Sequence, residues 1–258
     1  MPLCVTGMHR SGTSMVTRLL NVCGLDLGPE RDLLPPAADN PAGFWENADF
    51  VRLDDALLRA RGGSWKRPPA TPGDGGALRG RALALVGRFA GREPWGWKDP
   101  RCCLTLPFWR ALVPGLRVLV CVRHPLAAAR SLAARGDVPC REALGLWLEY
   151  NRRVLAAVPP DERVVTHYES YFEAPRAELS RVLRLLDLVP PCGAVARACA
   201  GIVPTLAHHH AAPADLGEDG LPRGLVESYR ELCAEGARPA PVQPAPGPQP
   251  LATAAPKG

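Results

Sequence analysis

Short apolar runs and helical repeats alternate along this chain. The run Leu3–Thr6 stops at Gly7, as a buried parallel strand does before its turn. From Thr13, apolar residues recur at helical spacing up to Cys23, and Gly24 follows as a stop signal. The chain is therefore expected to begin with a strand, a loop and a helix.

The same alternation continues further along the chain. Apolar runs predict strands at Trp95–Trp97, Arg117–Val122 and Arg163–Thr166, of which the second is the clearest. Helical spacing predicts helices at Phe50–Leu58, Leu126–Arg135, Arg141–Val158, Pro175–Leu186 and Leu221–Ala234. Strands that alternate with helices indicate an α/β fold with three layers, in which helices flank a central parallel β-sheet.

Segments rich in proline and glycine separate these elements. Leu34–Pro41 is expected to be a loop, and Pro68–Gly80, with three prolines and four glycines, a mobile surface loop. Seven prolines and few large apolar side chains follow Ala237. We therefore expect one domain over residues 1–236 and a disordered Pro/Ala-rich tail over 237–258.

Composition and charge narrow the function classes. The 258 residues are 47% hydrophobic and 22% charged, as in a globular protein, and the net charge is +5. The basic residues are scattered, which argues against a nucleic-acid partner and is compatible with a small anionic ligand. No signal peptide and no run of ~20 apolar residues is visible, so we expect a soluble, cytoplasmic protein without a transmembrane segment.

Nine cysteines are present, but no CxxC motif. Cys4, Cys23 and Cys121 fall within apolar segments, and Cys102 and Cys103 are adjacent. This distribution favours reduced residues of the core over disulfides.

The loop after the first strand has the glycine spacing of a phosphate loop. Gly7 and Gly12 stand five residues apart, and the hydroxyl residues Thr13 and Ser14 follow. Such glycines allow backbone N–H groups and the start of the next helix to converge on an anion, although a plain glycine turn capped by a hydroxyl is the alternative. A P-loop-type fold is therefore expected.

The residue after Gly12 is Thr13 and not the lysine that an enzyme using a nucleoside triphosphate normally needs. Arg10 instead places a cation with a bidentate fork inside the loop, which suits a terminal phosphate or sulfonate without a metal. This difference weighs against a kinase that uses ATP and magnesium.

The sequence GMHRSGTS resembles the 5′-phosphosulfate loop of sulfotransferases, especially the branch that contains bacterial and tyrosylprotein sulfotransferases. The resemblance implies that the co-substrate is 3′-phosphoadenosine 5′-phosphosulfate, with no metal required. Its 5′ end would be bound by the loop residues Gly7, His9, Arg10, Ser11, Gly12, Thr13 and Ser14.

A second match lies about one hundred residues further on. Arg123 follows the clearest strand, and Ser131 lies eight residues later on the predicted helix. In the family an arginine and a serine at this separation bind the 3′-phosphate of the donor, and the resemblance gives Arg123 and Ser131 these roles. The alternative is a surface cation and a neutral helix residue, although ligands of open parallel sheets do bind at the carboxyl ends of strands.

Three residues are candidates for catalysis. Lys98 matches a Lys-Asp-Pro segment of the tyrosylprotein branch, whose lysine lies by the bridging oxygen of the donor. Glu46 resembles the glutamate base that follows the phosphate loop in that branch, but it can also be a carboxylate that stabilises a helix start. Arg10 is the third, as a cation for the transferring group.

Other polar residues have weaker assignments. Asp99 and Arg101 can orient Lys98 or contact the acceptor. The run His208–His210 is read as surface or pocket lining and not as a metal site, because three consecutive side chains cannot face one ion. His167–Glu169 resembles a Tyr-Glu-Asp segment of the family and is read mainly as structural.

The leading hypothesis is a sulfotransferase that acts on a hydroxyl of a small molecule, lipid or glycan. A P-loop nucleotide kinase or phosphotransferase that uses ATP and magnesium is the second. A non-catalytic nucleotide-binding domain is the third.

Overall fold

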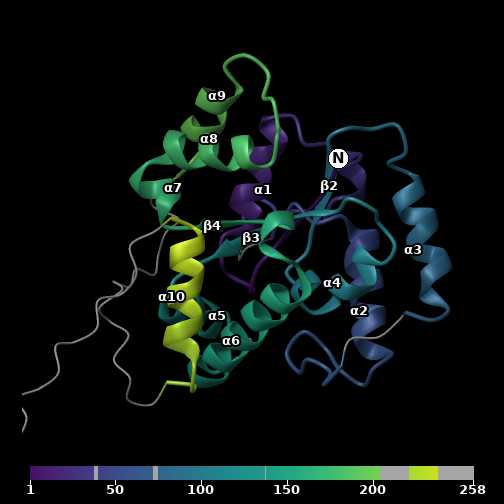
Figure 1. Ribbon diagram of the computed structural model, residues 1–258, viewed down its shortest axis with the longest axis vertical. Helices are drawn as coiled ribbons and strands as arrows, with labels where there is room; N and C mark the ends of the chain where they lie inside the picture. The colour runs from purple at the N-terminus through teal and green to yellow at the C-terminus, as the bar shows by residue number, and fades with distance from the viewer. Residues whose placement is uncertain (38–39, 72–74, 137, 204–220, 238–258) are drawn as a thin grey trace, which may run out of the picture.

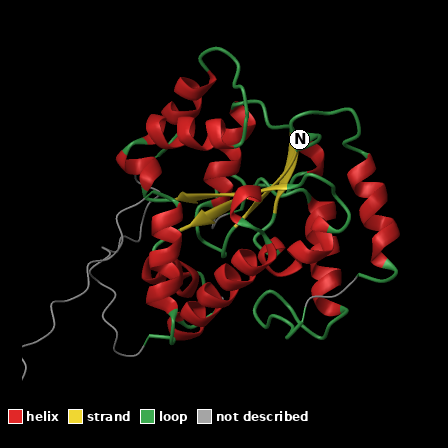
Figure 2. Ribbon diagram, viewed as in Figure 1, coloured by secondary structure: helices red, strands yellow, loops and turns green. Residues whose placement is uncertain are grey.

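In the computed structural model, four parallel strands form one sheet in the order β2-β1-β3-β4, with helices on both faces (Figures 1 and 2). The structure describes residues 1–37, 40–71, 75–136, 138–203 and 221–237. The expected α/β fold with a central parallel sheet is confirmed. Its strands are β1 (Pro2–Thr6), β2 (Trp95–Lys98), β3 (Arg117–Val122) and β4 (Arg163–His167).

The strands are aligned so that their carboxyl ends reach the same edge of the sheet. Val5 of β1 pairs with Lys98 on one side and with Leu119 on the other. Leu119 in turn pairs with Val164 of β4. The residues that follow the strands therefore come together at one edge, where ligands of parallel sheets bind.

Alternate residues of the strands face two separate cores, as the period of two in a strand requires. On one face, Leu3 and Val5 of β1 and Leu119 and Cys121 of β3 are buried against α1, α8 and α9. Figure 1 shows these helices together on one side of the sheet. Their bounds are α1 (Thr13–Val22), α8 (Pro175–Leu185) and α9 (Ala194–Ala200), and the short α7 (Ser170–Glu173) precedes α8.

The second core, on the other face, is larger and more aromatic. Cys4, Val118 and Val120 meet Trp97, Trp109 and other side chains from the helices that cover this face. The helices are α2 (Ala48–Arg59), α3 (Leu78–Gly87), α4 (Cys102–Arg110), α5 (Pro125–Ala134), α6 (Cys140–Ala157) and α10 (Leu225–Glu235). Single turns of 3-10 helix lie at Glu30–Asp32 and Pro160–Glu162.

The predicted surface loop Pro68–Gly80 is wrong at its end, because α3 begins at Leu78. Good helix formers follow, and Ala82 and Leu85 are buried against the core. Gly80 is not sterically required within the helix, since a Cβ there would meet nothing within 4 Å. Three further helices, α4, α7 and α9, were also not predicted from the sequence.

The cysteines are mostly core residues, as expected. Six of the nine are buried, and Cys140 and Cys199 are partly buried and pack against the two cores. The prediction is wrong for Cys192, which is exposed. Burial raises the pKa of the Cys103 thiol to about 12, despite a hydrogen bond with Thr6, so this thiol stays protonated at neutral pH.

Among the helices of the described residues, none combines the length and the apolar composition needed to cross a bilayer. Two predictions fall where the structure gives no description. The His208–His210 run lies outside the described residues, and so does the tail at 237–258 apart from Ala237.

Candidate active site

The loop between β1 and α1 forms a cradle in which both glycines are sterically required. A Cβ on Gly7 would lie 2.1 Å from the backbone oxygen of Cys121, and one on Gly12 would lie 2.2 Å from the ring of Tyr168. Gly12 has a φ of 82° and precedes α1, whose first turn has no acidic residue. The helix N-terminus is therefore available to an anion.

Ser11 carries an unsatisfied hydroxyl inside this cradle. Its backbone N–H donates to the carbonyl of Met8 at 3.1 Å, which closes a turn of the loop. Its side chain is 1% exposed, and the Oγ atom has no hydrogen-bond partner among the described residues. Because buried polar atoms are normally hydrogen-bonded, this hydroxyl points to a ligand with acceptor oxygens.

Lys98, at the end of β2, meets Glu46 and the first turn of α1. Its Nζ donates to Oε1 of Glu46 at 2.6 Å and to Oγ of Ser14 at 3.2 Å. Asn40, which the sequence did not single out, donates to the same Ser14 oxygen at 3.3 Å. Four residues, two of them predicted to be catalytic, thus form one hydrogen-bonded group.

The sequence around Glu46 explains how it reaches Lys98. Gly43 and Trp45 have φ values of 87° and 59°, so the chain turns sharply before α2. Asn47 caps α2 by accepting from the N–H of Asp49 at 3.0 Å, a role suited to its short amide side chain. Glu46 therefore does not cap the helix, and its carboxylate contacts Lys98.

A second group forms around Arg123, directly after β3. Its guanidinium lies 4.5 Å above the ring of Tyr168, and its Nη1 donates to the backbone oxygen of Arg10 at 3.2 Å. Arg10 in turn donates from Nε to Oγ of Ser131 on α5 at 3.1 Å. The structure therefore brings Arg10, Arg123 and Ser131 together, as a phosphate site would require.

Tyr168 was read as structural from the sequence, but it takes part in this group. It follows β4 at the carboxyl edge of the sheet, which is the signal that could have identified it. Its neighbours do have structural roles: His167 is fully buried with Nε2 3.1 Å from the carbonyl of Leu232, and Glu169 accepts from the N–H of His124 at 2.9 Å.

The imidazole ring of His9 lies near two aromatic rings. Its centroid is 4.4 Å from the ring centroid of Trp65 and 5.9 Å from that of Tyr150. Burial lowers its pKa well below the ordinary value, and the charges of Arg101, Lys98 and other nearby cations lower it further. His9 is therefore neutral at physiological pH and adds no charge to the loop.

Asp99 supports Arg101 and not Lys98. Its Oδ1 accepts from the backbone N–H of Arg101 at 2.8 Å and from its Nη1 at 3.0 Å, and Asp55 accepts from Nε at 2.7 Å. Burial raises the pKa of Asp99 well above its usual range, against the opposing charge of Arg101. These contacts fix the orientation of Arg101 at the cavity wall.

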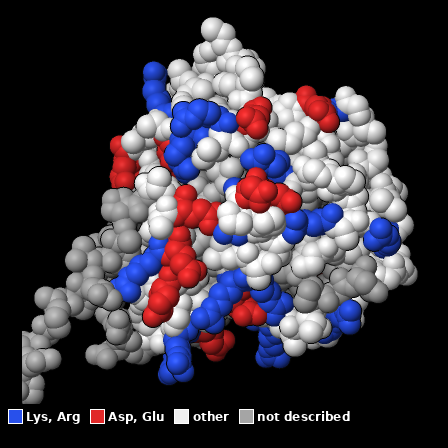
Figure 3. Space-filling view, in the orientation of Figure 1, with Lys and Arg blue, Asp and Glu red and all other residues white. Residues whose placement is uncertain are grey.

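The two groups line one cavity of about 720 Å³ at the carboxyl edge of the sheet. Its described lining contains one carboxylate, that of Glu46, against six cations: Arg10, Arg18, Lys98, Arg101, Arg123 and Arg135. This excess of positive charge favours an anionic ligand. On the face of the molecule drawn in Figure 3, Lys and Arg are interspersed with Asp and Glu.

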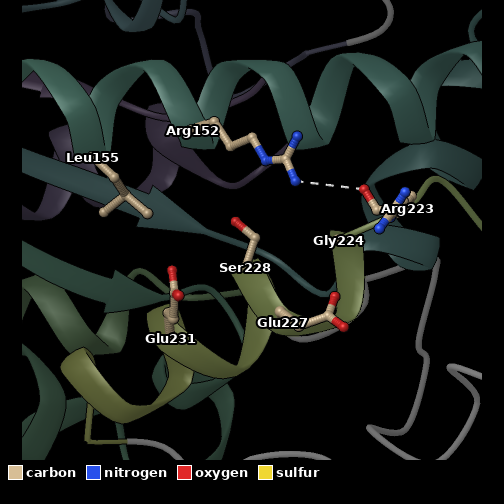
Figure 4. Close-up of a pocket in the computed structure, with 7 residues that line it drawn as sticks. All are labelled: Arg152, Leu155, Arg223, Gly224, Glu227, Ser228 and Glu231. Atoms are coloured by element: carbon tan, nitrogen blue, oxygen red, sulfur yellow. Dashed lines mark hydrogen bonds between the residues drawn. The ribbon is translucent and has the colours of Figure 1, made fainter.

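A second hollow lies between α6 and α10 (Figure 4). Two arginines, Arg152 and Arg223, and two glutamates, Glu227 and Glu231, line it, so its charges balance. It shares no described lining residue with the larger cavity.

The protein is thus of the α/β class, with a glycine cradle at the edge of a parallel sheet that adjoins a cationic cavity and suits an anionic ligand. The family model described as "Sulfotransferase family" matches residues 2–190, and the chain belongs to that family. No curated protein sequence matches this chain.

Solved sulfotransferase structures are similar in fold. STF1 from Mycobacterium tuberculosis superposes with a TM-score of 0.55 at 16% identity, over 78% of this chain and 70% of that one. The sulfotransferase domain of the Synechococcus olefin synthase gives 0.52 at 20% identity, over 93% and 96%. STF9 from Mycobacterium avium gives 0.51 at 17% identity, over 93% and 78%. At these identities the likeness concerns the fold alone.

Proposed function

We propose that this protein transfers a sulfuryl group from 3′-phosphoadenosine 5′-phosphosulfate to a hydroxyl of a small molecule, lipid or glycan. The observation that carries the proposal is the convergence of two groups in one cavity. Lys98 and Glu46 belong to one group, and Arg123 and Ser131 belong to the other. The phosphate loop contributes Ser14 to the first group and Arg10 to the second.

The residues present fit such a donor. The glycine cradle, the N–H groups that begin at Thr13 and the unsatisfied hydroxyl of Ser11 suit a 5′-phosphosulfate. Arg123 and Ser131 suit a separate 3′-phosphate, since an arginine fork and a hydroxyl both donate to phosphate oxygens. A nucleoside triphosphate would leave the second group without an anion.

When bound, the donor supplies the sulfuryl group, whose bond to the phosphate oxygen breaks as the acceptor oxygen binds sulfur. We assign to Glu46 the removal of the acceptor proton and to Lys98 the stabilisation of charge on the leaving phosphate. Ser14 holds the Lys98 ammonium from the start of α1. The tyrosylprotein-type resemblance of these residues stays a prediction.

The acceptor would enter beside the loop that precedes α2. Phe44, Trp45 and Trp65 line the cavity and are partly buried, which leaves aromatic surface for a flat or saccharide acceptor. The expected cytoplasmic location stays a prediction.

Two measurements test the proposal. Incubation with radiolabelled donor and an acceptor library should yield a labelled product. Calorimetry should show tighter binding of adenosine 3′,5′-bisphosphate than of ATP with magnesium. Preferred binding of ATP with magnesium would favour a kinase, and nucleotide binding without any transfer would favour a non-catalytic domain.

A further inference from the structure

The side chain of Arg10 leaves the phosphate loop and reaches α5. Its Nε donates to Oγ of Ser131 at 3.1 Å, although the two residues are 121 positions apart in sequence. Arg10, Arg123 and Ser131 all line the cavity. The cation of the loop is therefore placed beside the group that suits a 3′-phosphate.

The backbone of Arg10 is also held in place by Arg123. Its φ of 68° is in the left-handed region, which is unfavourable for a residue with a Cβ. The guanidinium of Arg123 donates to its carbonyl oxygen at 3.2 Å. Such strained residues persist only where their surroundings hold them, and they concentrate at ligand sites.

Charge and hydrogen bonding also indicate a shared anion. Burial lowers the pKa of Arg123, and the positive charge of Arg10 lowers it further. Tyr168 and Glu169 act in the opposite direction and raise the pKa of Arg123. The positive charges of Arg10 and Arg123 repel each other, and a bound dianion would relieve the repulsion. Because Ser131 accepts from Arg10, its own hydroxyl proton can be donated to a ligand oxygen.

We propose that Arg10 determines donor specificity by binding the 3′-phosphate together with Arg123 and Ser131. This inference rests on the proposed function, because it assumes the 3′-phosphorylated donor. It changes the assignment made from the sequence, where Arg10 was expected at the transferring sulfonate. Lys98 keeps its assignment at the leaving phosphate, and Arg10 selects nucleotides that carry a 3′-phosphate over those that do not.

Calorimetry with two nucleotides tests this role without any acceptor. Adenosine 3′,5′-bisphosphate and adenosine 5′-monophosphate differ only in the 3′-phosphate. Arg10→Gln should weaken binding of the bisphosphate by about 10- to 100-fold, the effect of losing charge-assisted hydrogen bonds. Binding of the monophosphate should weaken by less than about threefold, because it lacks the group that Arg10 contacts.

The matched control is Arg130→Gln, which removes the same charge from an exposed position next to Ser131 and should change neither affinity. Arg10→Lys keeps the positive charge but not the bidentate geometry of the guanidinium, so it should lose part of the affinity for the bisphosphate. This variant replaces Arg10→Gln in the test if Arg10→Gln does not fold. Equal losses for both nucleotides in the variant that folds would overturn the inference. A wild-type protein that bound both nucleotides equally would instead overturn the proposed donor.

Discussion

Oε1 of Glu46 lies 2.6 Å from Nζ of Lys98, and the side chains are 10% and 1% exposed. An ion pair this buried has two consequences for any variant. Removing one partner leaves the other charge buried, which typically costs about 3–5 kcal/mol of stability. It also removes a group that we assign to the chemistry, so stability and turnover must be measured together.

The first prediction concerns Glu46→Gln, which keeps the shape and one acceptor oxygen for Lys98. Turnover of the labelled donor, with an acceptor found by the library screen, should fall by about 10²- to 10⁴-fold, because the amide cannot take a proton. Affinity for adenosine 3′,5′-bisphosphate should change by less than about threefold. Unchanged turnover would mean that another residue is the base.

The second prediction concerns the ring beneath Arg123. Tyr168→Ala should weaken binding of adenosine 3′,5′-bisphosphate by about 5- to 30-fold, since a desolvated cation–π contact is worth roughly 1–2 kcal/mol. Tyr168→Phe keeps the ring and should bind within about twofold of the wild type. Calorimetry on both variants separates the role of the ring from that of the hydroxyl. If Tyr168→Phe lost as much affinity for the bisphosphate as Tyr168→Ala, the hydroxyl and not the ring would be responsible.

Much of the fold could be predicted from the sequence, because each strand is a short apolar run with a clear stop. Arg117–Val122 is a strand with the predicted bounds, and the phosphate loop stands where its glycines indicate. Helix α4 was missed for a physical reason. It is buried on nearly all sides, so its sequence, from Cys102 to Arg110, lacks the polar positions that reveal a helical period.

The site was harder to predict where it depends on contacts between the side chains of particular residues. The sequence places Lys98 and Arg123 at strand ends, and parallel strands bring such ends together. It gives no sign that Asp99 holds Arg101, or that Arg10 reaches Ser131, because both depend on side-chain direction. Local pattern therefore identifies the edge of the sheet, and only the packing shows which residues pair there.

The third prediction tests how closely β3 approaches the phosphate loop. Gly7→Ala would place a Cβ 2.1 Å from the backbone oxygen of Cys121, which cannot rotate away as a side chain can. Stability should fall by about 1–3 kcal/mol, measured by urea unfolding. Gly145→Ala on α6, where a Cβ meets nothing within 4 Å, should instead raise stability by up to about 1 kcal/mol. Equal midpoints for the two variants would contradict the close approach.

The fourth prediction concerns the dependence of stability on pH. Glu178 of α8 accepts hydrogen bonds from Thr166 at 2.5 Å and from Arg181 at 2.7 Å and 2.9 Å. Burial alone would raise its pKa, but the bonds from Arg181 and Thr166 lower it below the ordinary value. A glutamate with a lowered pKa stabilises the fold above its unfolded pKa of about 4.3, and that contribution is lost as the pH falls.

Glu178→Gln should therefore reduce the free energy of unfolding by about 1–3 kcal/mol at pH 7, the usual effect of losing hydrogen bonds to a charged group. The difference from the wild type should shrink as the pH is lowered from 5 to about 3, because the wild-type carboxylate then takes up a proton. Glu142→Gln, at an exposed position of α6, should show no such trend. A difference for Glu178→Gln that stayed constant between pH 7 and pH 3 would contradict the prediction, because it would mean that the negative charge of Glu178 does not stabilise the fold.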